Sequence, residues 1–447
     1  MVLAAACGAL ALGGVFAYRK VDFALRSYLR GGADYDELDR HRSGQAGDPG
    51  PESAFAREDY WTDFRGPDRA GTYAELPLIE TWPVGGPPLS WKQPCGAGYS
   101  SFVVAGGLAF TLEQRREREA LVAYELNSGR EVWVSEWDGH FTEALSKEGP
   151  RSTPVYAGGR LFAQGATGEL LCVDALSGRT LWRRNVLADT SAENLTYGLA
   201  ASPLVVGGLA IAQSGVPAGE GSVIAYDVGN GEPAWTALSE PMAYSSPLRA
   251  RLLDKEQVVV ATAARVCGLE PGTGEELWSF PWAVANGLSC SQPIPVGPAR
   301  LLLSAGYGKG AALIELAATE RGLVAHELWK SNRLKNRFNT SVVHGAYVYG
   351  LDDGVFTCVE LESGKRVWKG GRYGYGQQLL VGENIVLTTE DGEICLLRAT
   401  PERWIELARI DAIDGMTLNV PALAHGRLLV RNFKQMACFD LRAPGKR

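Results

Sequence analysis

The chain has 447 residues, of which 46% are hydrophobic and 21% charged, a composition that supports a substantial core and excludes a wholly disordered chain. Lysine and arginine number 44 against 51 aspartates and glutamates, a net charge of −7, which argues against a nucleic-acid partner because the phosphate backbone selects basic surfaces. Eight cysteines are too few for a disulfide-held small protein, and no pair has the C-x-x-C spacing of a zinc or thioredoxin-type site.

Residues 1–18 form an uncharged apolar run that Arg19 and Lys20 follow directly. The length suits either a short membrane helix or the apolar part of a signal peptide. Because no basic stretch precedes the run and no clear cleavage site follows it, we expect an uncleaved membrane anchor, with a cleaved signal as the alternative. The basic flank after the run would favour the cytoplasm, which conflicts with an exported body, so the sequence leaves the membrane orientation open.

Residues 19–58 are polar and mix glycine, proline and charged side chains. This composition predicts a flexible tether that contains one short helical turn near 35–40. Residues 59–87 form a lead-in segment, and we expect the folded body to begin close to Trp61.

One segment recurs along the rest of the chain. In VDALSGRTLW, which ends at Trp182, an acidic residue precedes a turn glycine by four positions and a tryptophan follows that glycine by four. This pattern predicts a strand, a tight turn and a second strand. Further clear copies end at Trp133, Trp235, Trp278 and Trp368, degenerate copies end at Trp329 and Trp404, and Trp91 lies in an isolated last-strand copy.

Eight polar segment starts, each followed by a β run and a glycine turn, precede or separate these copies. Residues 88–441 divided by eight give about 44 residues a unit, the length of a four-stranded propeller blade. The last unit ends before its tryptophan strand, whereas Trp91 lies in a tryptophan strand before the first unit. We therefore predict an all-β, eight-bladed β-propeller over residues 88–441 that is closed by an N-terminal strand pairing into the last blade.

The repeated tryptophans suit the gaps between blades, because a large ring with one N–H donor fills space and still finds a hydrogen-bond acceptor. We assign this structural docking role to Trp91, Trp133, Trp182, Trp235, Trp278, Trp329, Trp368 and Trp404. Four cysteines share one register of the third strand, where other units have alanine or glycine; they are Cys172, Cys358, Cys395 and Cys438. We expect them to be buried and unpaired, whereas Cys95 and Cys290 begin strands and could face the channel.

The segment D-x-x-[ST]-G-[KR]-x-x-W resembles the tryptophan-docking repeat of the pyrroloquinoline-quinone (PQQ) type propellers, over about four fifths of the chain. The sequence YWTDFRGPDRAGTY (60–73) is similar to a lead-in that precedes such propellers in exported bacterial proteins. The resemblance implies an eight-bladed fold and an extracytoplasmic, periplasmic location. It does not decide the function, because the family contains quinoprotein dehydrogenases and also the propeller lipoprotein of the outer-membrane β-barrel assembly machine.

A quinone dehydrogenase of this kind needs a calcium site, a carboxylate base and commonly a vicinal disulfide, and this chain has no Cys-Cys pair. It also has no C-x-x-C-H haem site. We therefore expect no metal and no cofactor, with PQQ and Ca²⁺ as the alternative. The favoured function is a membrane-tethered, monomeric, non-catalytic propeller that binds an envelope protein or peptide. The alternative is a quinone-dependent alcohol or sugar dehydrogenase, or another ligand-binding redox protein.

The first strands of propeller blades line the central channel, so the polar starts predict a ring of ligand-binding side chains at one channel mouth. These are Tyr99, Ser100, Arg151, Ser152, Ser202, Tyr244, Ser245, Ser291, Gln292, Asn339, Gln377 and Asn419. Arg151 and Asn339 would suit the carboxylate of a quinone or a peptide. The alternative is that these side chains only satisfy strand ends and channel water.

Overall fold

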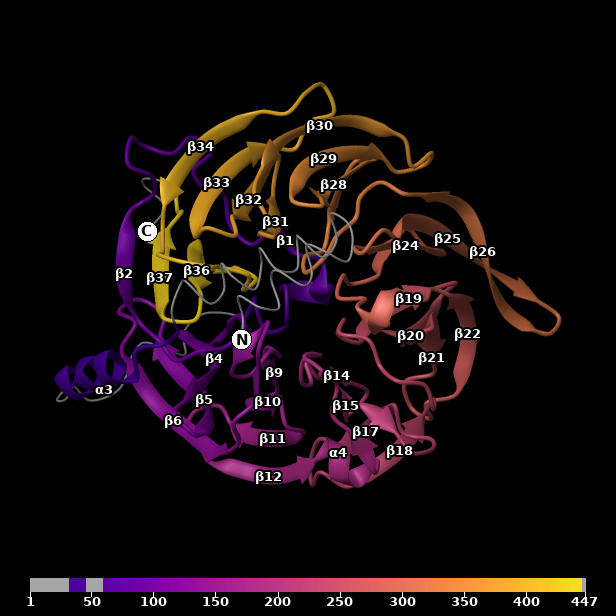
Figure 1. Ribbon diagram of the computed structural model, residues 1–447, viewed down its shortest axis with the longest axis horizontal. Helices are drawn as coiled ribbons and strands as arrows, with labels where there is room; N and C mark the ends of the chain where they lie inside the picture. The colour runs from indigo at the N-terminus through magenta and orange to yellow at the C-terminus, as the bar shows by residue number, and fades with distance from the viewer. Residues whose placement is uncertain (1–31, 46–58, 444–447) are drawn as a thin grey trace, which may run out of the picture.

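The structure is a computed structural model that describes residues 32–45 and 59–443. Eight antiparallel sheets stand side by side in a closed ring around a central channel (Figure 1). The predicted eight-bladed propeller is therefore confirmed. Glycine turns separate short strands of β-branched and aliphatic residues, and this alternation produces one antiparallel sheet per sequence unit.

The eight blades, A to H, follow one another along the chain. Blade A contains β3 (Val103–Ala105), β4 (Leu108–Arg115), β5 (Arg118–Glu125) and β6 (Glu131–Asp138), and blade B contains β9 (Val155–Ala157), β10 (Arg160–Gln164), β11 (Glu169–Asp174) and β12 (Thr180–Asn185). Blade C contains β14 (Leu204–Val206), β15 (Leu209–Gln213), β17 (Val223–Asp227) and β18 (Pro233–Ala237), and blade D contains β19 (Leu248–Leu252), β20 (Lys255–Ala261), β21 (Arg265–Leu269) and β22 (Glu276–Pro281).

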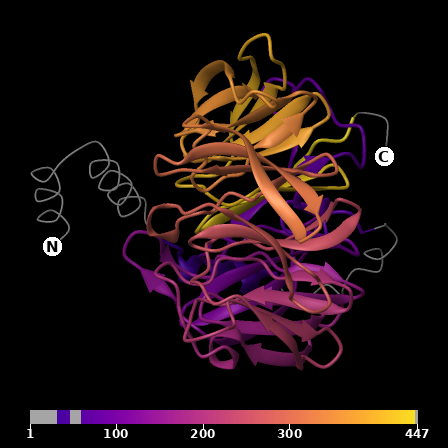
Figure 2. The same cartoon turned by 90° about the vertical axis from the view of Figure 1, so that its right-hand side faces the viewer.

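Blade E contains β23 (Ile294–Val296), β24 (Arg300–Ala305), β25 (Gly310–Thr319) and β26 (Gly322–Ser331), and blade F contains β27 (Val342–His344), β28 (Tyr347–Asp352), β29 (Val355–Glu360) and β30 (Arg366–Arg372). Blade G contains β31 (Gln377–Val381), β32 (Asn384–Thr388), β33 (Glu393–Arg398) and β34 (Glu406–Asp411), and blade H contains β35 (Ala422–Ala424), β36 (Arg427–Arg431), β37 (Gln435–Asp440) and β2 (Leu89–Pro94). The long β25–β26 hairpin projects beyond the ring in Figure 1 and crosses the front of Figure 2.

Short elements lie between the blades. The strand β1 (Thr72–Tyr73) pairs in parallel with β31 on the inner side of blade G. The strands β7 (Thr142–Glu143) and β8 (Lys147–Glu148) form a small hairpin. A second two-stranded sheet pairs β13 (Ala192–Glu193) with β16 (Val216–Pro217), and β14 and β15 lie between them in the sequence. The short helices are α4 (Val186–Asp189), η1 (Pro67–Arg69) and η2 (Ala285–Gly287).

The N-terminal strand β2 closes the ring. It pairs antiparallel with β37 of the last blade, with Trp91 opposite Cys438, and Figure 1 shows these two ends of the chain side by side. Without β2, the edge of β37 would be unpaired and the ring ends would not be joined. The predicted closure is thus confirmed.

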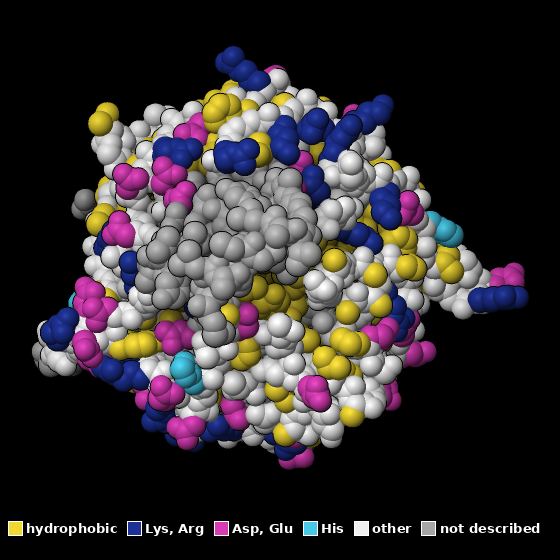
Figure 3. Space-filling view, in the orientation of Figure 1, with side chains coloured by type: hydrophobic (Ala, Val, Ile, Leu, Met, Phe, Trp, Pro, Cys, Tyr) yellow, Lys and Arg dark blue, Asp and Glu magenta, His cyan; other side chains and the backbone are white. Residues whose placement is uncertain are grey.

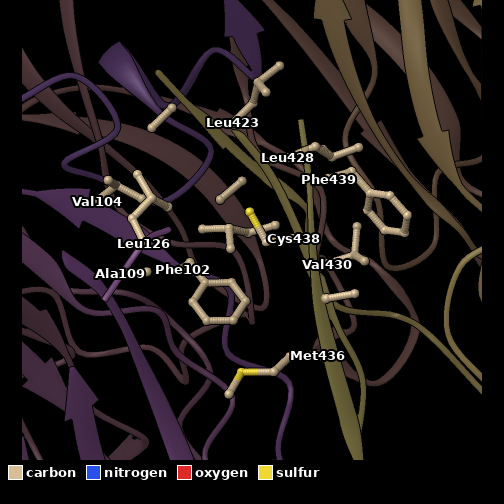
Figure 4. Close-up of a cluster of buried hydrophobic side chains, with 14 of the residues drawn as sticks. Phe102, Val104, Ala109, Leu126, Leu423, Leu428, Val430, Met436, Cys438 and Phe439 are labelled. Atoms are coloured by element: carbon tan, nitrogen blue, oxygen red, sulfur yellow. The ribbon is translucent and has the colours of Figure 1, made fainter. Parts of the chain in front are cut away.

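The hydrophobic core lies between adjacent blades. At the junction of blades H and A, Phe102 and Ala109 of blade A share one buried cluster with Val430 and Met436 of blade H (Figure 4). The described cysteines are all free, and the four that share the third-strand register are buried. They occupy the interblade core as small apolar side chains.

Six of the repeated tryptophans dock on the following blade. Trp91, Trp133, Trp182, Trp235, Trp329 and Trp368 each donate the indole N–H to a backbone carbonyl of the next blade, over 2.9–3.1 Å. In five of these cases the ring also lies against the turn glycine of that blade, so closely that an added Cβ would come within 2.9 Å of it. The turn glycine is therefore the platform on which the ring packs.

Two tryptophans depart from the predicted docking. Trp278 bonds Gln257 of its own blade at 2.6 Å, because blade E replaces the short glycine turn with the long β25–β26 hairpin. Trp404 bonds Tyr373 at 3.0 Å and is 39% exposed. In blade H the third and fourth strands come from opposite ends of the chain, so no turn joins them to receive Trp404.

Part of the expected tether is a helix packed on blade A. The helix α3 (Tyr35–Gly44) is capped by Asp34, whose side chain accepts a hydrogen bond from the Glu37 backbone amide. Arg42 pairs with Glu131 at 2.9 Å, and Arg116 pairs with Asp36 and Asp39. The helix is longer than the predicted single turn, and these ion pairs hold it against blade A. The expected apolar anchor, 1–18, lies outside the described residues, and within the described residues no helix combines the length and apolarity needed to cross a bilayer.

Candidate functional site

The lead-in segment crosses the channel and ties several blades together. The Trp61 carbonyl accepts from the Val104 amide of blade A at 2.7 Å, and the Gly71 carbonyl accepts from the Leu380 amide of blade G at 2.8 Å. Between them, the Arg69 guanidinium donates to the Pro247 carbonyl at the start of blade D. The segment therefore plugs the channel from one side of the ring to the other (Figure 1).

Two buried arginines of this plug have different surroundings. Arg69 forms an ion pair with Asp63 at 2.8 Å and also reaches the carbonyls of Ser202 and Pro203. Arg65 is 1% exposed, and none of its guanidinium nitrogens has a hydrogen-bond partner among the described residues. Burial lowers the pKa of Arg65 to about 10, so this side chain is still charged at neutral pH.

A cavity of about 220 Å³ lies in the channel, and Phe64 of the plug forms part of its wall. Every blade contributes to the lining, and Figure 3 shows hydrophobic side chains near the centre of this face. The polar and aromatic lining side chains are Tyr99, Ser146, Arg151, Tyr197, Tyr244, Ser246, Cys290, Gln292, Tyr307, Arg337, Phe338 and Gln377. No described acidic residue lines the cavity.

Five of the residues predicted for the channel mouth line this cavity: Tyr99, Arg151, Tyr244, Gln292 and Gln377. The others, Ser100, Ser152, Ser202, Ser245, Ser291, Asn339 and Asn419, are buried behind the lining. Asn339 donates to the Gly376 carbonyl at 3.1 Å and so does not join Arg151 in the predicted pair. Five of the seven side chains bond backbone groups near strand ends, as the alternative predicted; they are Ser100, Ser152, Ser202, Asn339 and Asn419.

A belt of interblade hydrogen bonds explains why the strand starts are rich in hydroxyls. The amide of Ser101 donates to Thr153 of blade B, the amide of Thr153 to Ser202 of blade C, and the amide of Ser202 to Ser246 of blade D, each at 2.9 Å. The amide of Gln292 donates in the same way to Thr340 of blade F at 3.0 Å. The belt therefore joins neighbouring blades around the channel.

The sequence prediction missed several lining residues, above all Arg337. Its position two residues before the predicted Asn339 was the available signal, since loops that precede inner strands face the channel mouth. Arg337 is 6% exposed, and its guanidinium lies 4.8 Å from the Tyr307 ring and 4.5 Å from the Tyr375 ring. Its Nε has no hydrogen-bond partner among the described residues.

Arg151, the second cation of the cavity, is already engaged. Its guanidinium donates to the Ser146 hydroxyl and the Lys147 carbonyl, each at 2.9 Å, and lies 4.4 Å from the Phe141 ring. Burial lowers the pKa of Arg151, but the cation–π contact and the carbonyls support the charged form.

The remaining titratable groups of the cavity are neutral at pH 7. Burial raises the pKa of Tyr244 to about 12 and that of the Cys290 thiol to about 12. A neutral thiol without an adjacent base is a poor nucleophile. Cys290 is partly exposed and lines the cavity, whereas Cys95 is buried.

The donor set of the cavity does not suit a calcium-bound quinone. Calcium requires several carboxylate and carbonyl oxygens, and in the described part of the chain no three histidine, cysteine or acidic side chains gather as a metal site. Two guanidinium groups line the cavity instead. The residues that line the cavity therefore do not fit PQQ with Ca²⁺.

Comparison with known proteins places this fold in a family. A family model described as outer membrane protein assembly factor BamB matches residues 117–370, from blade A to blade F. The chain belongs to this BamB family. A BamB of Bordetella pertussis is 21% identical over 354 residues, which cover 76% of this chain and 83% of that protein.

Solved structures with the same fold include BamB-family and quinoprotein members. BamB from Moraxella catarrhalis has a TM-score of 0.58 and 15% identity, covering 79% of this chain and 99% of that one. The quinohemoprotein alcohol dehydrogenase from Comamonas testosteroni has a TM-score of 0.65 and 13% identity, covering 92% and 85%. At such identities the likeness shows the propeller fold alone.

Proposed function

We propose that this BamB-family chain is a non-catalytic scaffold of the cell envelope that takes part in the assembly of outer membrane proteins. The family match across blades A to F carries the proposal, because the relative from Bordetella pertussis is named as an outer membrane protein assembly factor. A periplasmic location agrees with this function. The apolar run 1–18 supports attachment to a membrane, and we expect the chain to be monomeric.

The quinoprotein alternative has weaker support. The dehydrogenases share the fold at 13% identity, but the cavity offers arginines where a calcium-bound quinone would require carboxylates. We therefore propose no cofactor for the scaffold.

The outer rim of blades F, G and H offers a surface for a protein partner. Exposed apolar side chains gather on the outer strands of these blades and the segments beside them: Val84, Leu89, Val367, Trp404 and Leu407. Basic residues of β30, namely Arg366, Lys369 and Arg372, lie on the same rim, where Figure 3 shows dark-blue side chains over β30 and β34. An apolar surface with a basic border suits a protein with an apolar patch and acidic neighbours.

The test is crosslinking in the producing bacterium with the tagged full chain. We expect an outer membrane assembly component to be captured, and we expect Leu407→Lys and Trp404→Ala to reduce that capture. Leu176→Lys is the matched control, because Leu176 is 61% exposed on blade B, away from this rim. Equal capture by the rim and control variants would contradict the assigned surface, and capture of no assembly component would contradict the function.

A further inference from the structure

The cavity contains a buried cation with an unbonded Nε–H group and a buried side-chain amide without a hydrogen-bond partner. The Arg337 guanidinium is buried, and its Nε is one of the buried polar atoms that no described group bonds. Gln292 is 2% exposed, and neither its side-chain nitrogen nor its oxygen has a hydrogen-bond partner among the described residues. Burying a charge or an amide without a hydrogen-bond partner is unfavourable, so this pair favours a ligand that supplies an anionic acceptor.

The fold holds these two groups on neighbouring segments. Gln292 begins blade E and Arg337 precedes blade F, and the Asn336 amide nitrogen lies 3.5 Å from the Ser291 hydroxyl. The backbone amide of Gln292 also donates to the Thr340 hydroxyl of blade F. These contacts fix the backbones that present the guanidinium and the amide to the same cavity.

The rest of the wall favours an apolar body on the ligand. Phe64, Leu288, Leu418 and Val420 contribute apolar surface, and Tyr197 and Tyr244 face each other with ring centroids 5.8 Å apart. Cavities of about 150 Å³ hold a benzene ring, so about 220 Å³ has room for a ring with a short acid chain. One guanidinium carries one positive charge, so the Arg337 end of the cavity matches a singly charged carboxylate, which its planar fork can bind through two parallel bonds.

From this geometry we propose that the cavity binds a monocarboxylate that carries an aromatic or apolar body, with the carboxylate on Arg337 and Gln292. Arg151 adds positive potential from the other side of the cavity, but its two terminal nitrogens already bond the Ser146 hydroxyl and backbone carbonyls, and only its Nε has no described partner. The ligand has two sources with the same chemistry, a free small acid or the carboxyl terminus of a protein. This proposal goes beyond the assembly function and does not depend on it, because it concerns the isolated chain.

The first test is isothermal titration of the purified full chain with 3-phenylpropionate and with its neutral amide, 3-phenylpropionamide. We expect saturable binding of the acid and at least tenfold weaker binding of the amide, the loss expected when a hydrogen-bonded charge is removed. Equal affinity for acid and amide, or no saturable binding of the acid at millimolar concentrations, would overturn the proposal.

Variants locate the site. Arg337→Gln should weaken binding of the acid at least tenfold, and Gln292→Leu should weaken it several-fold, while Arg333→Gln should leave it unchanged, because Arg333 lies on the same loop outside the cavity lining. Thermal unfolding of each variant shows whether it folds, and the comparison of acid with amide on the unaltered chain does not depend on any variant. An Arg337→Gln protein that folds and keeps full affinity for the acid would contradict the assignment of the carboxylate to Arg337.

A third arm separates the two sources. Gly-Gly-Phe with a free carboxyl terminus is compared with the same peptide amidated. Tighter binding of the free peptide than of 3-phenylpropionate supports a protein terminus as the source, and binding of 3-phenylpropionate alone supports a free acid. Both results keep the carboxylate on Arg337.

Discussion

Replacing the turn glycine of one blade should weaken the junction with the preceding blade. Gly178 lies in the β11–β12 turn with a φ of +72°, and a Cβ added there would lie 2.7 Å from the Trp133 ring. Gly159, in the β9–β10 turn of the same blade, has a φ of +79° but no atom within 4 Å of its added Cβ. The two glycines thus share the backbone requirement and differ in the tryptophan contact.

The magnitude follows from this difference. Alanine in the left-handed region costs about 1–2 kcal/mol at either position. Only Gly178→Ala also drives a methyl group into a packed ring, which adds about 1–3 kcal/mol. We therefore expect Gly178→Ala to lower the free energy of unfolding by about 1–3 kcal/mol more than Gly159→Ala does.

Urea unfolding followed by far-ultraviolet circular dichroism measures both variants without relying on tryptophan fluorescence. A Trp133→Leu background completes the test, because the difference between the two glycine variants should largely disappear once the ring is removed. Equal losses in the unaltered background, or a difference that persists without Trp133, would refute the docking explanation.

Two further predictions concern charged groups. Arg65→Met should raise the free energy of unfolding by about 1–3 kcal/mol, because it removes a buried charge that no described residue pairs. Arg69→Met should lower the free energy of unfolding by about 3–5 kcal/mol, because it leaves Asp63 without its ion pair. Urea unfolding measures both variants, and an Arg65→Met protein that is no more stable than the unaltered chain would contradict this reasoning. The Arg442 guanidinium holds the pKa of Asp440 at about 2, below its ordinary 3.8, so the stabilisation from Asp440 is present above that ordinary value and is lost as the pH falls through about 2. Asp440→Asn should therefore flatten the acid limb of the stability profile in thermal unfolding, and an unchanged acid limb would contradict the assignment.

The blades could be predicted because their signal is local. An acidic residue, a glycine and a tryptophan at fixed spacing specify a strand, a turn and a second strand within one short segment, as at Asp174, Gly178 and Trp182. The docking of a tryptophan depends also on the neighbouring blade. Trp278 meets a long hairpin, and Trp404 meets a blade assembled from both chain ends, so their own repeats could not predict their contacts.

The cavity was less predictable, because loops rather than strands determine its lining. Several of the polar strand starts do reach the cavity, among them Tyr99, Tyr244 and Gln292. Whether a side chain one or two positions earlier faces inward depends on how each loop turns. Leu334, with a φ of +58°, redirects the loop that presents Arg337, and no spacing rule in the sequence encodes that turn.

The assembly function is tested most directly by deleting the gene in the producing bacterium and quantifying the proteins of its outer membrane. The proposal predicts lower amounts of outer membrane proteins in the deletion strain and recovery when the full chain is supplied. Unchanged outer membrane protein levels, measured in a strain confirmed to lack the chain, would contradict a role in their assembly.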